Sequence, residues 1–198
     1  QGIPVDGRAF AGDWSAWLSP FALMTGLALL VGYALLGATW LVLKAEGEVH
    51  RKALRFARIS AIGTLILIAV VSIWTPTLHE HFAQKWFAWP DVTYVAIVPL
   101  LVLICAWSLF QGLRKGEGKQ AYLSTAGLFV LSYIGLLISF FPYIVPSSVT
   151  LWDAAAPDES LRFVLVGAVF LIPIILTYTG YAYWVFRGKV GASGGYHS

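Results

Sequence analysis

Charged residues divide the chain into five long stretches that contain no Asp, Glu, Lys or Arg. These stretches cover 14–43, 59–79, 92–113, 120–152 and 163–186. Each can hold a helix of about 20 residues, the length that crosses the hydrocarbon core of a bilayer. The pattern therefore predicts an all-α, polytopic membrane helix bundle with about five transmembrane helices.

Local sequence signals indicate where each span begins and ends. All the spans belong to a single membrane domain over residues 1–198. We expect spans at about 20–43, 59–78, 92–110, 121–141 and 161–186. Ser19 followed by Pro20 is typical of a helix start, because the hydroxyl caps the helix and proline fits its first position. Gly112, with two basic residues behind it, suits the end of the third span. Pro99 and Pro173 are expected to kink the third and fifth spans.

Composition leaves no room for a separate soluble domain. The 198 residues are 59% hydrophobic and 12% charged, against about 25% charged residues in soluble domains. The net charge of +3 comes from basic residues between the spans, which argues against nucleic acid as a partner. The single cysteine, Cys105, lies inside an apolar stretch and is interpreted as a small packing residue.

The basic residues are distributed unevenly between the two sides of the membrane. Ten Lys and Arg fall in the 44–58 segment, the 111–120 turn and the tail after Phe186, against three on the other side. The positive-inside rule then places the N-terminus outside and the C-terminus in the cytoplasm, with 44–58 as a basic cytoplasmic turn. Because the chain starts outside without a signal peptide, we expect it to be the C-terminal part of a longer subunit.

The histidines are not placed to ligate haem inside the bundle. Haem in a helix bundle needs axial ligands within the spans, whereas His50 falls in the basic turn, His79 and His81 in an outer loop and His197 in the tail. Two imidazoles around Glu80 without a third ligand make a weak metal site. We therefore predict no catalytic residue, no cofactor ligand and no metal site in this chain.

Two surface features are candidate sites. Arg51, Arg55 and Arg58 fall at positions i, i+4 and i+7, on one face of a helix that enters the second span. This basic cytoplasmic face could bind an anionic lipid head group or an acidic partner, although ordinary orientation charges that snorkel are the favoured interpretation. In the outer loop, we expect Asp153 to cap a short surface helix, with Trp152 anchored in the interface beside it. The alternative is that Asp153 handles protons or quinol.

Two stretches carry a family resemblance: GATWLVLKAEG at 37–47 and FPYIVPSSVTLWDAAAPDESLRFVLVGAVFLIPIILTYTGYAYWVFRGKV at 141–190. The second closely resembles the C-terminal part of subunit II of the cytochrome bd quinol oxidases, and the likeness extends across nearly the whole chain. The resemblance implies a multi-pass protein of the bacterial cytoplasmic membrane, in a complex that oxidises membrane quinol and reduces dioxygen to water.

The resemblance also implies a division of labour within that complex. Haems b and d and the quinol-oxidising loop belong to subunit I, while this chain packs beside it as a non-catalytic subunit, with membrane lipid or a bound quinone between its spans. The acidic residues that the family associates with proton delivery lie in spans that precede the five seen here.

Two other functions would leave recognisable signals in the sequence. A scaffold part of a small-molecule transporter would be supported by a buried carboxylate or a broken helix with convergent polar groups, and the sequence shows neither. A haem-bearing cytochrome b anchor would need histidines within the spans.

Overall fold

Five long helices dominate the computed structural model, which describes residues 5–6, 9–15, 18–78, 86, 89, 95–145 and 149–186. The helices are α1 (Pro20–Lys44), α2 (Gly47–Trp74), α5 (Ile97–Lys115), α6 (Gly118–Phe140) and α7 (Asp158–Val185). Each is long and apolar enough to cross a membrane. The prediction of an all-α bundle with five membrane-spanning helices is confirmed.

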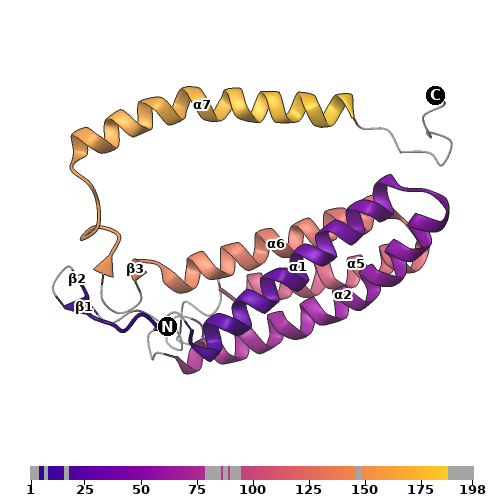
Figure 1. The fold of residues 1–198 in the computed structure, drawn as a ribbon, viewed down its shortest axis with the longest axis horizontal. Helices are drawn as coiled ribbons and strands as arrows, with labels where there is room; N and C mark the ends of the chain where they lie inside the picture. The colour runs from indigo at the N-terminus through magenta and orange to yellow at the C-terminus, as the bar shows by residue number, and fades with distance from the viewer. Residues whose placement is uncertain are drawn as a thin grey trace.

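Short elements lie at the helix ends. The 3-10 helix η1 (Thr75–Thr77) continues α2. Strands β1 (Val5–Asp6) and β2 (Ala9–Phe10) form one antiparallel pair, and β3 (Tyr143–Val145) and β4 (Val149–Thr150) form another. The β3–β4 pair connects the end of α6 to the loop that leads into α7 (Figure 1).

Helices α1, α2, α5 and α6 pack into a bundle (Figure 1). In this bundle α1 contacts α2 and α6, and α5 contacts α6 and α2. Its core combines large aliphatic side chains with alanines: Leu35, Leu109, Leu113, Leu128, Ala38, Ala57, Ala61 and Ala121. Small residues at helix contacts allow the close backbone approach on which packing in a membrane depends.

Two glycines mark the closest approaches between helices. A Cβ atom added to Gly118 would lie 2.5 Å from the Cα of Leu43, and one added to Gly112 would lie 2.8 Å from the backbone N of Ala121. In both cases the obstacle is backbone, which cannot rotate away. The start of α6 is therefore pressed against the end of α1 and the last turns of α5.

The predicted start of α1 is confirmed, but the prediction of a turn over residues 44–58 is wrong. The Ser19 Oγ accepts a hydrogen bond of 3.1 Å from the N–H of Ala22, with Pro20 at the first helical position. Helix α2 already begins at Gly47, whose φ is +65°, so the connection from α1 is only two residues long. A helix can extend beyond the hydrocarbon region, and the charges before residue 59 lie on its exposed first turns.

The end of α5, the position of Pro99 and the start of α7 also differ from the predictions. Gly116, with φ +72° in the left-handed region, ends α5, whereas Gly112 is buried inside that helix and serves close packing. Pro99 lies in the first turn of α5, where no helical hydrogen bond from its nitrogen is required. Helix α7 continues through Pro173. It begins at Asp158, so its first turn contains acidic side chains that favour the positive end of the helix dipole.

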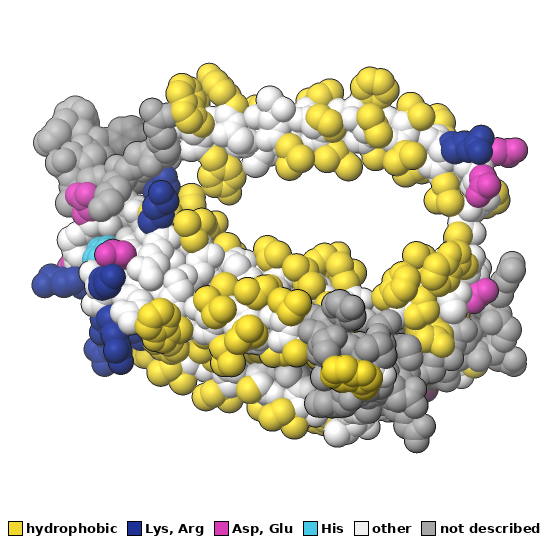
Figure 2. All heavy atoms as spheres, turned by 180° about the vertical axis from the view of Figure 1, so that it is seen from behind, with side chains coloured by type: hydrophobic (Ala, Val, Ile, Leu, Met, Phe, Trp, Pro, Cys, Tyr) yellow, Lys and Arg dark blue, Asp and Glu magenta, His cyan; other side chains and the backbone are white. Residues whose placement is uncertain are grey.

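Helix α7 runs along the bundle but contributes no buried residue to it. Figure 1 shows α7 linked at one end through the β3–β4 segment and returning toward the end of α1 at the other. The space-filling view shows an opening between α7 and the bundle, edged by hydrophobic side chains (Figure 2). The fold is thus a four-helix bundle with a fifth, separately held apolar helix.

Candidate functional site

The three arginines of the predicted basic face do not behave alike. All three are exposed on the first turns of α2. The Nη2 of Arg58 donates a hydrogen bond of 2.9 Å to the backbone O of Leu113, a carbonyl near the C-terminus of α5, where the helix dipole favours a cation. Arg51 and Arg55 make no such contact with the described part of the chain. Arg58 therefore joins two helices, and the other two point their charges outward.

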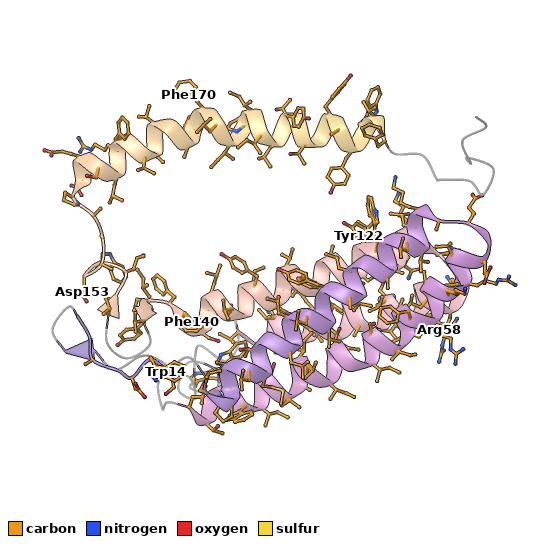
Figure 3. All side chains as sticks on the ribbon, in the orientation of Figure 1. Trp14, Arg58, Tyr122, Phe140, Asp153 and Phe170 are labelled. Atoms are coloured by element: carbon orange, nitrogen blue, oxygen red, sulfur yellow. The ribbon has the colours of Figure 1, made fainter. Side chains whose placement is uncertain are left out.

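Further cations surround these arginines. Lys52 forms an ion pair of 2.8 Å with Glu48 on the same helix, and Arg114 and Lys115 are exposed in the last turn of α5. Figure 2 shows Lys and Arg side chains gathered at one end of the bundle, and Figure 3 places Arg58 at that end and Asp153 at the far one. The end of the bundle around the α1–α2 connection is therefore strongly basic.

His50 lies in the first turn of α2 and not in a turn as expected. Its Nδ1 is 3.0 Å from the backbone O of Val42, so the ring ties the start of α2 to the last turn of α1. His79, His81 and His197 lie outside the described residues. Among the residues that the structure describes, no three His, Cys, Asp or Glu side chains come together as a metal site.

A polar groove opens beside His50, where α6 begins. Three of its polar side chains bond to one another: the Nε2 of Gln120 donates to the Oγ of Ser108 at 3.2 Å, and the Oγ of Ser124 donates to the same atom at 2.8 Å. These contacts satisfy the hydroxyl and amide groups within the α5–α6 contact. These hydrogen bonds therefore support the packing of α5 against α6.

Polar groups buried within the described bundle are all hydroxyls: Thr39, Ser60, Thr64, Ser124, Thr125 and Ser139. Thr39 donates to the backbone O of Leu35 at 3.0 Å, and Thr125 donates to that of Ala121 at 3.0 Å. Thr64 has no hydrogen-bond partner within the described region. Such hydroxyls are neutral over the whole working pH range, so the buried groups described here carry no charge that could titrate.

The C-terminal end of α7 is attached to the basic end of the bundle. The Nζ of Lys44 donates a hydrogen bond of 3.0 Å to the backbone O of Phe186 and lies 5.2 Å from the centre of the Trp40 ring. The same Trp40 ring meets Tyr183 of α7 edge to face, with ring centres 6.0 Å apart. We call Lys44, Trp40 and Tyr183 the latch, because they hold α7 to α1.

The loop between β4 and α7 differs from the prediction at Asp153. No short helix follows this residue, since 151–154 form a turn and a bend and 155–157 have no regular secondary structure before α7. Its Oδ2 instead accepts hydrogen bonds from the backbone N–H of Thr150, at 3.2 Å, and from the Thr150 hydroxyl. These two hydrogen bonds lower the pKa of Asp153. Trp152 is exposed and meets Phe141 edge to face at 5.9 Å, so the loop closes backward onto the end of α6.

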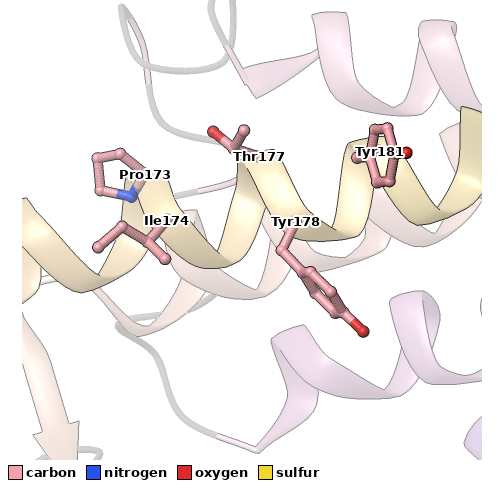
Figure 4. Close-up of a pocket in the computed structure, with 5 residues that line it drawn as sticks. All are labelled: Pro173, Ile174, Thr177, Tyr178 and Tyr181. Carbon is pink, nitrogen blue, oxygen red and sulfur yellow. The ribbon is translucent and has the colours of Figure 1, made fainter.

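A shallow groove on α7 does not form a binding site. It is lined by Pro173, Ile174, Thr177, Tyr178 and Tyr181 (Figure 4). All five residues belong to one helix and are exposed, so no opposite wall encloses a ligand. The groove is a surface on which another apolar body could pack.

Comparison with known proteins identifies the family. The family model for cytochrome bd terminal oxidase subunit II matches residues 1–186. The chain belongs to this family. The resemblance inferred from 37–47 and 141–190 is thereby confirmed, and the five apolar helices fit the multi-pass inner-membrane protein that a bacterial oxidase subunit II would be.

Three curated relatives are similar to this subunit II chain at low identity. Cytochrome bd-I ubiquinol oxidase subunit 2 of Escherichia coli (strain K12) is 24% identical over 96% of this chain and 59% of its own length. The probable cytochrome oxidase subunit 2 of Haemophilus influenzae is 25% identical, over 98% and 60%. Cytochrome bd ubiquinol oxidase subunit 2 of Bacillus subtilis is 22% identical, over 96% and 56%. The chain thus spans less than two thirds of the length of these relatives.

Sequence reasoning missed the contacts that bind the helix ends together in this subunit II chain. The Arg58–Leu113 hydrogen bond and the latch both join a basic side chain to a backbone carbonyl of another helix. A partial signal was present, since Lys44 and Arg58 directly border charge-free stretches, but Arg114, Lys119, Arg162 and Arg187 do so as well. The partner carbonyls, however, depend on how the helices cross, and no sequence pattern specifies that.

Proposed function

We propose that this chain is a haem-free scaffold within a terminal oxidase that oxidises membrane quinol and reduces dioxygen to water in the respiratory chain. The observation that carries the proposal is the subunit II family match over residues 1–186. The relatives from E. coli and B. subtilis are named as subunits of ubiquinol oxidases, which supports a membrane quinol as the reductant of the complex. In this proposal the chain is a non-catalytic subunit of an oxidoreductase.

Haems b and d would be held by a partner, the haem-bearing subunit I. The interior of the described bundle supports this division, because its buried polar side chains are those of Ser and Thr, whereas axial haem ligands are His, Met, Cys or Tyr. His50 is engaged with the Val42 carbonyl at the end of the bundle, far from the middle of the membrane. A bound quinone or lipid tail would lie against the largely apolar surface of the spans.

The same proposal gives the chain a direction in the membrane. Basic side chains gather at the end that joins α1 to α2 and α5 to α6, and such ends face the cytoplasm in most membrane proteins. Asp153 and Trp152 would then face outside. The N-terminus of the chain would lie outside and its C-terminus in the cytoplasm.

Packing beside subunit I is the role that the free surface of α7 supports. This helix buries none of its residues, although its most apolar 18-residue window has a mean hydropathy of 2.3. A helix with this composition is stable in lipid and can also pack against a neighbouring apolar helix. We infer that α7 and the adjoining face of the bundle help to cover and position the haem-bearing subunit.

Spectroscopy with and without the partner tests the proposal. Expressed without subunit I and supplied with haem, the chain should purify without a Soret band, whereas the complex should show haem bands and quinol-dependent oxygen uptake. Stoichiometric haem in the chain alone, lost on replacement of His50, His79 or His81, would overturn the haem-free role. A complex that forms without this chain and retains full oxygen uptake would overturn the scaffold role.

A further inference from the structure

One exposed face of α2 changes from cationic to apolar along its length. Arg51, Arg55, Ile59, Ile62 and Ile66 follow one another at intervals of four, four, three and four residues, which keeps them on the same side of a helix. The three isoleucines are 63%, 53% and 58% exposed. We call these five residues the α2 stripe.

The position of the stripe matches the depth of a bilayer leaflet. Arg55 precedes Trp74, the last residue of α2, by about 28 Å at 1.5 Å per residue, close to the thickness of about 30 Å of the hydrocarbon core. If Trp74 marks one interface, Arg55 lies at the other, and Arg51 lies one turn farther out. Ile66 lies about 16 Å along the helix from Arg55, which is about one leaflet.

The cationic end of the stripe has no counter-charge from the described residues. Arg51 and Arg55 form no ion pair with the described residues, and the nearby Glu48 is paired with Lys52. The hydrogen bond of Arg58 to Leu113 brings the end of α5, with its exposed Arg114 and Lys115, against the same part of α2. Uncompensated cations at the depth of the lipid phosphates attract anionic lipid.

We propose that the α2 stripe binds one anionic phospholipid, its phosphate at Arg51 and Arg55 and an acyl chain along Ile59, Ile62 and Ile66. Guanidinium groups suit this ligand, since their fork of donors binds phosphate oxygens in pairs. Arg58 is excluded from the site because its guanidinium is bound to the α5 carbonyl. The proposal does not depend on the chemistry of the oxidase, only on this face of α2.

Lipid exchange followed by native mass spectrometry tests the site. The purified full-length protein, in whatever complex it forms, is exchanged into detergent with phosphatidylglycerol or phosphatidylcholine, and the lipids retained are counted. We expect phosphatidylglycerol to be retained preferentially. The double variant Arg51→Ala/Arg55→Ala should weaken its binding about 30-fold, at roughly fivefold per arginine, and leave phosphatidylcholine unaffected.

Matched controls separate the site from general charge effects. Lys119→Ala/Arg162→Ala removes two exposed positive charges outside the stripe and should retain phosphatidylglycerol as the unmodified protein does. Equal losses in the two double variants, or no loss in either, would overturn the proposal. Arg51→Gln/Arg55→Gln serves as the second variant if the alanine version is poorly expressed, with the same expected loss.

Two further measurements identify the occupant. Excess inorganic phosphate should not displace the lipid, because the isoleucines contribute to its binding; displacement by phosphate would show an ion site and overturn the lipid assignment. A photo-reactive residue at Ile62 should cross-link to phosphatidylglycerol in vesicles. Cross-linking to a protein instead would show that a partner subunit covers this face and would also overturn it.

Discussion

Replacing Gly118 by alanine tests the close packing of α6 on α1. The added Cβ would lie 2.5 Å from the Cα of Leu43, 2.7 Å from its backbone N and 2.7 Å from the backbone O of Val42. Carbon atoms in favourable contact are about 3.5–4.0 Å apart. The two helix ends would therefore have to separate by about 1 Å or more.

The cost of this separation follows from the kind of atoms involved. All three obstructing atoms are backbone, so no side-chain rotation can relieve the overlap. Overpacking of this kind costs about 1–3 kcal/mol, which exceeds the gain of up to about 1 kcal/mol from the higher helix propensity of alanine. We expect Gly118→Ala to be destabilising, with a fall in melting temperature of several degrees.

Thermal unfolding of the purified protein in one detergent measures the effect. Gly37→Ala is the matched control, because an added Cβ at Gly37 in α1 meets nothing within 4 Å. Its melting temperature should stay the same or rise. A second variant, Gly118→Ala with Leu43→Ala, should remain destabilised, since truncating the Leu43 side chain leaves its backbone in place.

Two results would refute this reasoning. If Gly118→Ala were as stable as the Gly37→Ala control, the helix ends would not be in the tight contact described. If Leu43→Ala restored the stability of Gly118→Ala, the obstacle would be the leucine side chain and not the backbone.

Four other measurements follow from the helix ends and the loop between β4 and α7. Arg58→Ala should lower the unfolding free energy by about 1 kcal/mol through the lost bond to α5, and an equal loss in Arg55→Ala would contradict it. The hydrogen bond to Asp153 should protect the Thr150 amide from hydrogen exchange. Because the pKa of the Asp153 carboxyl is lowered from 3.8 in the folded protein, its ionised form stabilises the loop. This stabilisation is full above the unfolded-state pKa and is lost as the pH falls through the lower folded-state pKa. Asp153→Ala should abolish that protection and, in the assembled oxidase, reduce the yield while leaving turnover per haem unchanged; normal assembly with a large loss of turnover would support a proton or quinol role. Lys115→Cys should be labelled only from the cytoplasm and Leu151→Cys only from outside, and the reversed pattern would contradict the proposed orientation.

The number of spanning helices could be predicted from the sequence because charge is costly in the hydrocarbon region. The ends of the helices could not be predicted from the absence of charged residues. A charge-free stretch indicates the width of the apolar region, whereas α2 begins at Gly47, twelve residues before the stretch that starts at Ile59. The twelve-residue difference contains Arg51 and Arg55, whose side chains point outward.

Particular side chains show why the candidate sites were only partly predictable. The spacing of Arg51, Arg55 and Arg58 predicted one common face, but the role of Arg58 depends on the position of the Leu113 carbonyl. Asp153 was expected to cap the chain after it and binds the Thr150 before it. Both partners are set by tertiary or turn geometry, which hydrophobic patterning does not encode.

The separate position of α7 bears on how the protein is made. The four helices of the bundle all precede α7 in the chain, and none of their core contacts requires a residue of α7. During synthesis, the bundle can therefore close while α7 is still emerging from the ribosome. The last helix then enters a membrane in which the bundle is already folded, and its C-terminal end meets Lys44 and Trp40 of α1.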